Sequence, residues 1–371
     1  MMLEVNGVQY TDFVSGNCEI RLDSLSNTFN FETVMTDGQP LPFKGGEACK
    51  VIVDGETVLT GFIEVVEVEG DAESHTVSIS GRDKTGDLLD STIGVRDKQT
   101  GEGSLDDVRG EGLSLKALIQ IVIAHLGINI SVIDEVGPPL FNGAEDIAAP
   151  EPGDNAFSFI SKYAEKRQVL LTSNADGNLV IAANSGTADD GVVQLILGAE
   201  DNNTESYSYS FDTTGRYNSY KISSGLNLTA LNNAGETDLA SAVEQSGGVF
   251  DTEIRTGRRL TLESRTPLSD AECLKRAFWE ADVRKARGLA YFAKVPLFRV
   301  GGDTGDLWGI NKIYQIVNDQ IGKIEPMLCN SITFTLDLDG GRSTQLGFVG
   351  QKAYTLDLNP EPQVKVADNV N

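Results

Sequence analysis

Residues 51–70, VIVDGETVLTGFIEVVEVEG, alternate apolar and polar side chains on either side of an Asp54-Gly55 pair. An Asp-Gly pair between alternating segments is a strong signal for a two-residue β-hairpin turn. Residues 75–80, HTVSIS, resume the alternation, and Asn6-Gly7 separates two more short strands near the N-terminus. Several short antiparallel strands at this spacing are typical of a small barrel or sandwich. We therefore expect a first β-barrel domain over residues 1–92.

The strand over residues 75–80 runs into a charged corner, ISGRDKTGDLLDS, residues 79–91. Its Gly81 and Gly86 have the spacing of the glycines in a phosphate-binding P-loop. A P-loop needs Lys and then Ser or Thr directly after its second glycine, whereas this chain has Asp87 and Leu88. A carboxylate there repels phosphate, so we predict a strand end held by an ion pair of Arg82 with Asp87 or Asp83.

The hydrophobic period changes to that of a helix after Leu113. Ser114 is placed to cap this helix and Gly127 to end it. A second helix is expected in DNAFSFISKYAEKR, residues 154–167, capped by Asp154 and followed by a glycine hairpin over residues 169–183. We expect residues 93–185 to form an α+β domain.

Alternation typical of strands returns between residues 205 and 224 and again after residue 289, with a polar stretch from Asn227 to Gly248 predicted as a long loop. Between them lies a long helix, residues 269–287, whose start has a Ser269/Glu272 capping box and whose end is Gly288. The positions expected on its inner face are Leu274, Ala277, Phe278 and Ala281.

The predicted fold class is therefore mixed β and α+β. Two small antiparallel β-barrel domains, residues 1–92 and 186–350, flank the α+β domain, and the long helix lies in the C-terminal half. Residues 351–371 lack a periodic apolar pattern and are expected to be a flexible or docking tail.

The composition argues against several kinds of site. With 55 acidic and 30 basic residues the formal net charge is −25, which disfavours simple nucleic-acid or anionic-lipid binding and also promotes solubility. Four cysteines lie far apart without a CxxC pair, so we expect buried thiols in a reducing compartment and no zinc site. The N-terminus lacks a signal-peptide pattern, and no apolar run approaches the length of a membrane span. No catalytic motif, cofactor site or metal site is predicted.

The corner resembles one in the N-terminal domain of the Mu-like phage baseplate hub proteins. In that family a Gly-Arg-Ser-Lys-Thr-x-Asp-Leu-Val-Asp corner follows a strand pair. This chain matches it at Gly81, Arg82, Asp87 and Asp90 among others, while Asp83 replaces the serine and Leu89 the valine.

Further segments resemble the same family in the same order. Residues 152–182 are similar to its helix and glycine hairpin, and SFDTTGRYNSYKISSG, residues 210–225, to the start of its second barrel. Its long helix and following segment are matched by two groups, Trp279, Glu280 and Arg284 in the first, and Leu307, Trp308 and Asn311 in the second.

The resemblance implies a structural virion protein without catalytic activity, similar in fold to the hubs of contractile tails and of type VI secretion spikes. Such hubs are homotrimers whose two barrels per chain form a six-part ring that joins the tail tube protein to the central spike protein. The implied partners are further copies of the chain, the tube, the spike and other baseplate proteins, with DNA passing through unbound. Assembly in the host cytoplasm is expected. The alternatives are a tail-associated cell-wall hydrolase and a glycan- or receptor-binding tail protein.

Overall fold

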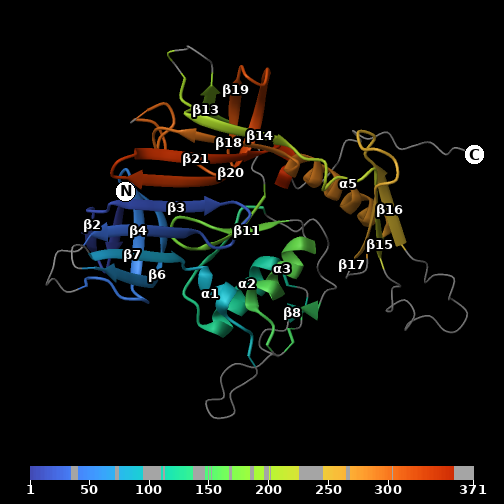
Figure 1. Cartoon of the computed structure of the whole chain (residues 1–371). Helices are drawn as coiled ribbons and strands as arrows, with labels where there is room; N and C mark the ends of the chain where they lie inside the picture. The colour runs from blue at the N-terminus through green and yellow to red at the C-terminus, as the bar shows by residue number, and fades with distance from the viewer. Residues whose placement is uncertain are drawn as a thin grey trace, which may run out of the picture. The chain divides into compact units, whose positions relative to one another are not determined.

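The computed structural model describes residues 1–34, 41–71, 75–94, 110–111, 113–136, 147–148, 150–151, 153–166, 169–183, 188–195, 200, 202–224, 245–264, 268–302 and 304–354. They form two compact units (Figure 1). Unit 1 comprises Met1–Ser208 and Phe292–Phe348, and unit 2 comprises Tyr209–Tyr291 and the described residues from Val349 on. The chain passes between the units within β14 (Ser206–Phe211), within β18 (Leu289–Val295) and at the end of β21 (Gly341–Val349).

Unit 1 begins with antiparallel strands joined by tight turns. Asn6 and Gly7 have φ of 51° and 81°, and Asp54 and Gly55 have φ of 45° and 86°. Two consecutive positive φ values define the turn that matches the twist of a two-residue hairpin, so both predicted hairpins are confirmed. The strands are β1 (Met2–Val5), β2 (Val8–Tyr10), β3 (Ser15–Arg21), β4 (Thr28–Val34), β5 (Ala48–Val53), β6 (Glu56–Gly70) and β7 (His75–Asp83).

The C-terminal strands of unit 1 join the same sheet. Residues Ser15–Arg21 of β3 pair antiparallel with residues Ser331–Asp337 of β20, and Figure 1 shows these blue and red strands side by side. β20 (Lys323–Asp337) also pairs with β19 (Ile313–Asn318), which in turn pairs with β13 (Ala188–Leu195).

The mixed, β-rich fold class is confirmed, but two closed barrels are not. The main sheet has the order β14-β18-β21-β20-β3-β4-β7-β6-β5-β1-β2, with β19 and β13 branching from β20. These pairings leave the sheet open among the described residues. The N-terminal and C-terminal strands share one sheet because β3 uses its second edge to pair with β20.

The middle of unit 1 contains the helices. Ser114 Oγ accepts the Ala117 N–H at 3.2 Å to cap α2 (Leu115–Leu126), and Gly127 ends it with φ of 68°, as predicted. The remaining elements are α1 (Gly86–Asp90), α3 (Ala156–Lys166), β8 (Gly110–Glu111), β9 (Val132–Asp134), β10 (Ile147–Ala148), β11 (Leu170–Ser173) and β12 (Leu179–Ala182). The helices share an apolar core with β11 and β12 that includes Leu88, Ile119, Val122, Phe159 and Ile160.

The cap of α3 differs from the prediction. Asn155 Oδ1 accepts the Ser158 N–H at 2.9 Å, so Asn155 caps the helix rather than Asp154. The Asp154 carboxylate instead accepts the Glu151 N–H at 3.1 Å and lies 3.7 Å from Lys162 Nζ. The two neighbouring residues are both good caps by composition, and one residue of register decides between them.

Unit 2 is a three-stranded sheet packed against one long helix. Central β15 (Ser219–Ser224) pairs antiparallel with β16 (Gln245–Phe250) and parallel with β17 (Arg259–Ser264). Helix α5 (Asp270–Arg287) starts with the predicted Ser269/Glu272 capping box, and a short 3-10 helix, η4 (Gln351–Tyr354), follows β21. The core between sheet and helix contains Tyr220, Ile222, Val249, Cys273, Ala277 and Ala281.

Two predictions about unit 2 were wrong in detail. Leu274 is 38% exposed, because the inner stripe of α5 runs through Cys273, Ala277 and Ala281, which leaves Leu274 beside it. The predicted loop Asn227–Gly248 ends earlier, since Gln245–Gly248 belong to β16, while residues 225–244 lie outside the described part. A Cβ on Gly247 would come within 2.2 Å of Leu274 N, so glycine allows this close approach of strand and helix.

Candidate functional site

The charged corner of unit 1 is organised around the buried carboxylate of Asp83. This residue ends β7 and is 2% exposed. It accepts hydrogen bonds from Ser26 Oγ (3.1 Å), Asn27 N (2.8 Å), Thr85 N (3.2 Å), Thr85 Oγ1 (2.6 Å) and Ser173 Oγ. A buried carboxylate without a cation needs such a set of donors to replace its hydration. Asp83 thereby joins three segments that are far apart in sequence.

The turn between β11 and β12 is attached to the N-terminal strands by further hydrogen bonds. Thr60 Oγ1 donates to Ala175 O at 2.8 Å, Lys84 Nζ donates to Asp176 O at 2.9 Å, and Thr172 Oγ1 donates to Arg21 O at 3.1 Å. With the Ser173–Asp83 bond, these contacts connect the glycine hairpin to β3, β6 and the corner. The corner is therefore a joint between the first strands and the helical part of unit 1.

Arg82 pairs differently from the prediction. Its Nε donates to Glu64 Oε2 at 2.8 Å and its Nη2 contacts Asp90, whereas Asp83 is turned into the core and Asp87 is exposed. These hydrogen bonds to Glu64 and Asp90 raise the pKa of Arg82. The largest effect on Asp87 is desolvation at the corner, which raises its pKa. The nearby carboxylates of Asp90 and Glu64 raise this pKa further. The alternation of β7 explains the error, because it places neighbouring Arg82 and Asp83 on opposite faces.

Gly81 allows the paired strands β6 and β7 to approach each other closely at this corner. A Cβ there would come within 2.0 Å of Phe62 O and 2.8 Å of the Phe29 ring. The predicted corner residues Gly81, Arg82, Asp83, Asp87 and Asp90 thus lie together, where β7 leads into α1.

The predicted residues of α5 form a second cluster, within unit 2. Glu280 is 8% exposed and receives Arg276 Nη2 and Arg284 Nε, each at 3.1 Å. The Arg276 guanidinium lies 4.4 Å from the centre of the Trp279 ring. These contacts order the exposed side of the helix around one nearly buried carboxylate.

The remaining predicted pair lies in unit 1. Trp308 is 4% exposed and packs on Tyr314, with 5.3 Å between ring centres. Asn311 adopts a left-handed backbone conformation with φ of 59°, and its Nδ2 donates to Ala183 O at 2.9 Å. Both residues shape the turn that leads into β19.

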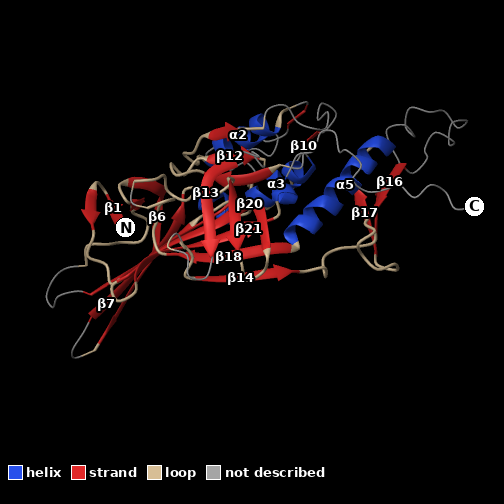
Figure 2. Cartoon of the chain, turned by 90° about the horizontal axis from the view of Figure 1, so that it is seen from above, coloured by secondary structure: helices blue, strands red, loops and turns tan. Residues whose placement is uncertain are grey.

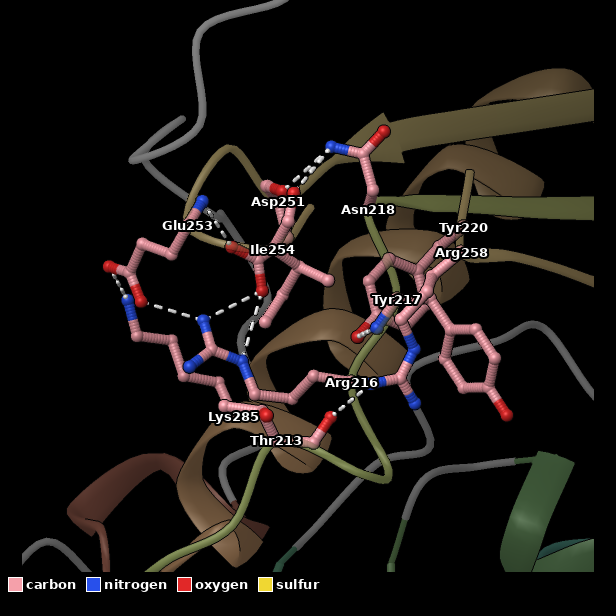
Figure 3. A network of polar contacts seen from close by, with 10 residues as sticks. All are labelled: Thr213, Arg216, Tyr217, Asn218, Tyr220, Asp251, Glu253, Ile254, Arg258 and Lys285. Atoms are coloured by element: carbon pink, nitrogen blue, oxygen red, sulfur yellow. Dashed lines mark hydrogen bonds and ion pairs between the residues drawn. The ribbon is translucent and has the colours of Figure 1, made fainter. Parts of the chain in front are cut away.

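No sequence pattern singled out Arg216, a buried cation in unit 2 (Figure 3). Arg216 is 1% exposed, and its Nη2 lies 2.8 Å from Asp251 Oδ2 and 2.7 Å from Glu253 Oε2. Glu253 also accepts Lys285 Nζ at 2.5 Å, so the network connects the turns next to β15 and β16 with helix α5. Its partners lie 35 or more residues downstream, and no spacing rule pairs them in advance.

The Asp83 corner and the Arg216 network consist of hydrogen bonds and ion pairs within the chain. Among the described residues, no group of three or more His, Cys, Asp or Glu side chains is arranged to hold a metal ion. In the same part of the chain no helix is both long and apolar enough to cross a bilayer. The contacts of the Asp83 corner and of the Arg216 network fix strands, turns and helices against one another.

Comparisons with known proteins show which proteins this chain resembles. Residues 1–83 match the family model of the N-terminal domain of Mu phage baseplate assembly protein GpP-like proteins, and residues 85–183 match the second domain of baseplate hub protein gp44-like proteins. The chain is 20% identical to baseplate hub protein gp44 of Escherichia phage Mu, over 97% of this chain and 90% of that protein. Residues 1–183 of the chain therefore consist of two domains of the Mu-like baseplate hub type.

Solved structures extend the likeness to tail proteins over nearly the full length of the chain. The 43 kDa tail protein of prophage MuSo2 from Shewanella oneidensis is 28% identical, with a TM-score of 0.75 over 95% of this chain and 98% of that one. A type VI secretion component of E. coli, the c3393 protein, is 9% identical with a TM-score of 0.54, over 96% of this chain and 80% of that one, and shares the fold. The family resemblance expected from the sequence is confirmed.

The two matched hub domains meet at the Asp83 corner. The first model ends at residue 83 and the second begins at residue 85. The carboxylate that ends the first domain is bonded to Thr85 at the start of the second and to Ser173 near its end. The joint between these domains is therefore a buried polar contact rather than a flexible linker.

A pH-dependent contribution to stability is expected from Glu253. Lys285 and then Arg216 hold the pKa of Glu253 below its ordinary value of 4.5. Because the folded pKa is lower than the unfolded one, the ionised carboxylate stabilises the fold above about pH 4.5. This contribution is lost as the pH falls through the folded pKa.

Urea unfolding of the wild type and Glu253→Gln at pH 6 and pH 3 measures this contribution. We expect the wild type to lose more stability between the two values, by a small amount, because Glu253 is half exposed. Equal losses in both proteins would contradict the assignment.

Proposed function

We propose that this chain is the structural hub of a contractile-tail baseplate and acts without catalysing a reaction. In this proposal three copies close into a ring whose six related β parts adapt a six-fold tail tube to a three-fold spike. The near end-to-end match to the Mu hub protein carries the proposal. The buried joints at Asp83 and Arg216 support it, because an adaptor under load needs its parts held in fixed geometry.

The corner residues have a role within this proposal. Asp83 bonds to both matched domains, while Arg82 bridges Glu64 of β6 and Asp90 of α1. We infer that Arg82, Asp83, Asp87 and Asp90 set the angle of the second domain on the first. The α5 group of Trp279, Glu280 and Arg284 and the turn group of Trp308 and Asn311 stabilise the C-terminal half in the same way.

The negative charge has a use in a ring that surrounds a passage for DNA. Three copies carry a formal charge of −75, three times the −25 of one chain. Carboxylates on the wall of such a passage repel phosphates and keep DNA from adhering, the reverse of a groove lined with Lys and Arg. The proposed partners are therefore the tube, the spike and other baseplate proteins, with DNA in transit.

The proposal predicts the mass in solution. A closed trimer of a 39.8 kDa chain has a mass of about 119 kDa. Light scattering on the purified full chain at micromolar concentration should give this value. A stable monomer or dimer would contradict the ring, and clearing of cell-wall material in zymograms would contradict the absence of catalysis.

A further inference from the structure

The far part of β6 has a free edge. β6 pairs with β5 as far as Phe62, and Ile63 is bonded to Gly46 and Glu47. Beyond that point, among the described residues, Val65–Gly70 pair with β7 alone. Figure 2 shows the strands around β7 projecting away from the remaining strands of unit 1. This edge presents unpaired backbone N–H and C=O groups, which act as a template for another strand.

The free edge of β6 is apolar on one face and acidic on the other. Val66 and Val68 lie opposite the buried Ile79 and Val77, but Val68 is 52% exposed because the core ends before it. Glu67 and Glu69 occupy the opposite face, and residues 56–71 contain no Lys or Arg. A strand that pairs with this edge needs an apolar face that can cover Val68 and a cation that can lie opposite a glutamate.

Strand β17 of unit 2 offers an apolar face and, on its other face, Arg259 together with Thr261 and Glu263. Within the described part of the chain it pairs with β15 only, so its other edge is free. Leu260 and Leu262 pack toward the core, whereas Arg259, Thr261 and Glu263 are exposed. Arg255 and Arg258 lie just before it.

The charge distribution of the chain supports the match. Residues 209–291 contain eleven basic and eleven acidic residues and are neutral, so the formal charge of −25 lies on the rest of the chain. A second copy of this chain therefore offers the acidic edge of β6 a free edge that lies in a neutral part of the chain and carries Arg259. Opposite charges of this kind select partners and fix register.

We propose that the free edge of β6 in one copy adds antiparallel to β17 of a neighbouring copy. The register that sets Val66 and Val68 opposite Leu262 and Leu260 also sets Glu69 opposite Arg259. A parallel pairing of the same apolar residues would set Glu69 opposite Glu263, with like charges facing, which is destabilising. The apolar face is matched in both arrangements, and the charged face favours the antiparallel one. This contact rests on the proposed ring, for which it supplies a specific subunit interface.

Cross-linking between two single-cysteine chains tests the register. Glu69→Cys and Arg259→Cys proteins are mixed, dissociated, reassembled and oxidised, so that any covalent dimer between them joins two copies. The four native cysteines are buried, and burial raises the pKa of Cys49 to about 12 and also raises that of Cys18 and Cys329, which keeps their background low. The matched control is Val65→Cys with Arg259→Cys, the pair that faces in the parallel arrangement. We expect about tenfold more heterodimer from the first mixture than from the control.

Charge reversal at Glu69 and Arg259 tests the same pairing independently. Glu69→Arg or Arg259→Glu alone should raise the trimer dissociation constant about tenfold, and the double variant should restore it. A wild-type trimer that gives no 69–259 cross-link and ignores both reversals overturns the pairing and leaves the ring intact. A monomeric wild type overturns the ring and the pairing together.

Discussion

Replacing Asp83 with alanine is expected to lower the free energy of unfolding by about 3–5 kcal/mol. The substitution removes the acceptor for the side chains of Ser26 and Ser173 and for the backbone N–H groups of Asn27 and Thr85, while the Thr85 hydroxyl can still donate to Leu25 O at 2.7 Å. These groups stay buried, and each unsatisfied donor costs about 1–3 kcal/mol unless the site relaxes or admits water. Because Asp83 bonds to both matched domains, we expect the two to unfold with lower cooperativity. Urea titration followed by fluorescence and by circular dichroism measures both effects.

Two further variants sharpen the Asp83 experiment. Asp83→Asn keeps the size of the side chain but turns one acceptor into a donor, so it should recover part of the loss. Asp87→Asn changes an exposed carboxylate on the same corner and should alter stability by about 0.5 kcal/mol or less. If Asp83→Ala costs no more than Asp87→Asn, Asp83 does not hold the joint.

Replacing Arg216 with methionine should destabilise unit 2 by about 3–5 kcal/mol. Methionine fills much of the space of the arginine stem but leaves the Asp251 carboxylate buried without its cation. Removing one partner of a buried ion pair costs more than removing both, because the remaining charge is uncompensated. Hydrogen exchange of the amides in β15, β16 and β17 should report the loss locally.

The double variant Arg216→Met with Asp251→Leu shows whether the loss of stability comes from the ion pair or from side-chain packing. It should be more stable than Arg216→Met alone, although not fully restored, since Asp251 also accepts the Glu253 N–H at 3.1 Å. Glu253→Gln is the control at the exposed end of the same network and should cost about 1 kcal/mol or less. A double variant no better than Arg216→Met would mean that the ionic contact is not the source of the stability.

Local signals predicted much of the fold. The Asn6-Gly7 and Asp54-Gly55 hairpins, the Ser114 cap and the Ser269/Glu272 box depend on residues within a few positions of one another, and all four are present. The error at Asp154 came from a choice between two adjacent good caps. Predicted barrel closure remained unconfirmed because it depends on which distant strands pair, and alternation says nothing about that.

For the candidate site, too, contacts between nearby residues could be predicted and contacts between distant residues could not. The sequence singled out Asp83, but its partner Ser173 lies 90 residues away, and the predicted pairing with Arg82 was wrong. Arg216 was missed because a single arginine in a turn carries no pattern, and its burial depends on Asp251 and Glu253 after a long intervening segment. By contrast, the ion pair of Glu280 with Arg284 in α5 has i, i+4 spacing, so helical geometry alone brings its partners together.

The pairing of β3 with β20 has a consequence for synthesis of the protein. Residues Ser15–Arg21 leave the ribosome more than 300 residues before Ser331–Asp337, with which they pair. At about 5–20 residues per second, β3 waits roughly 15–60 s for its neighbour. During that time one edge of the nascent N-terminal sheet is open and able to pair with the same edge of another growing chain. Slower elongation or higher expression should therefore increase aggregation of this chain, and a chaperone that shields strand edges should reduce it.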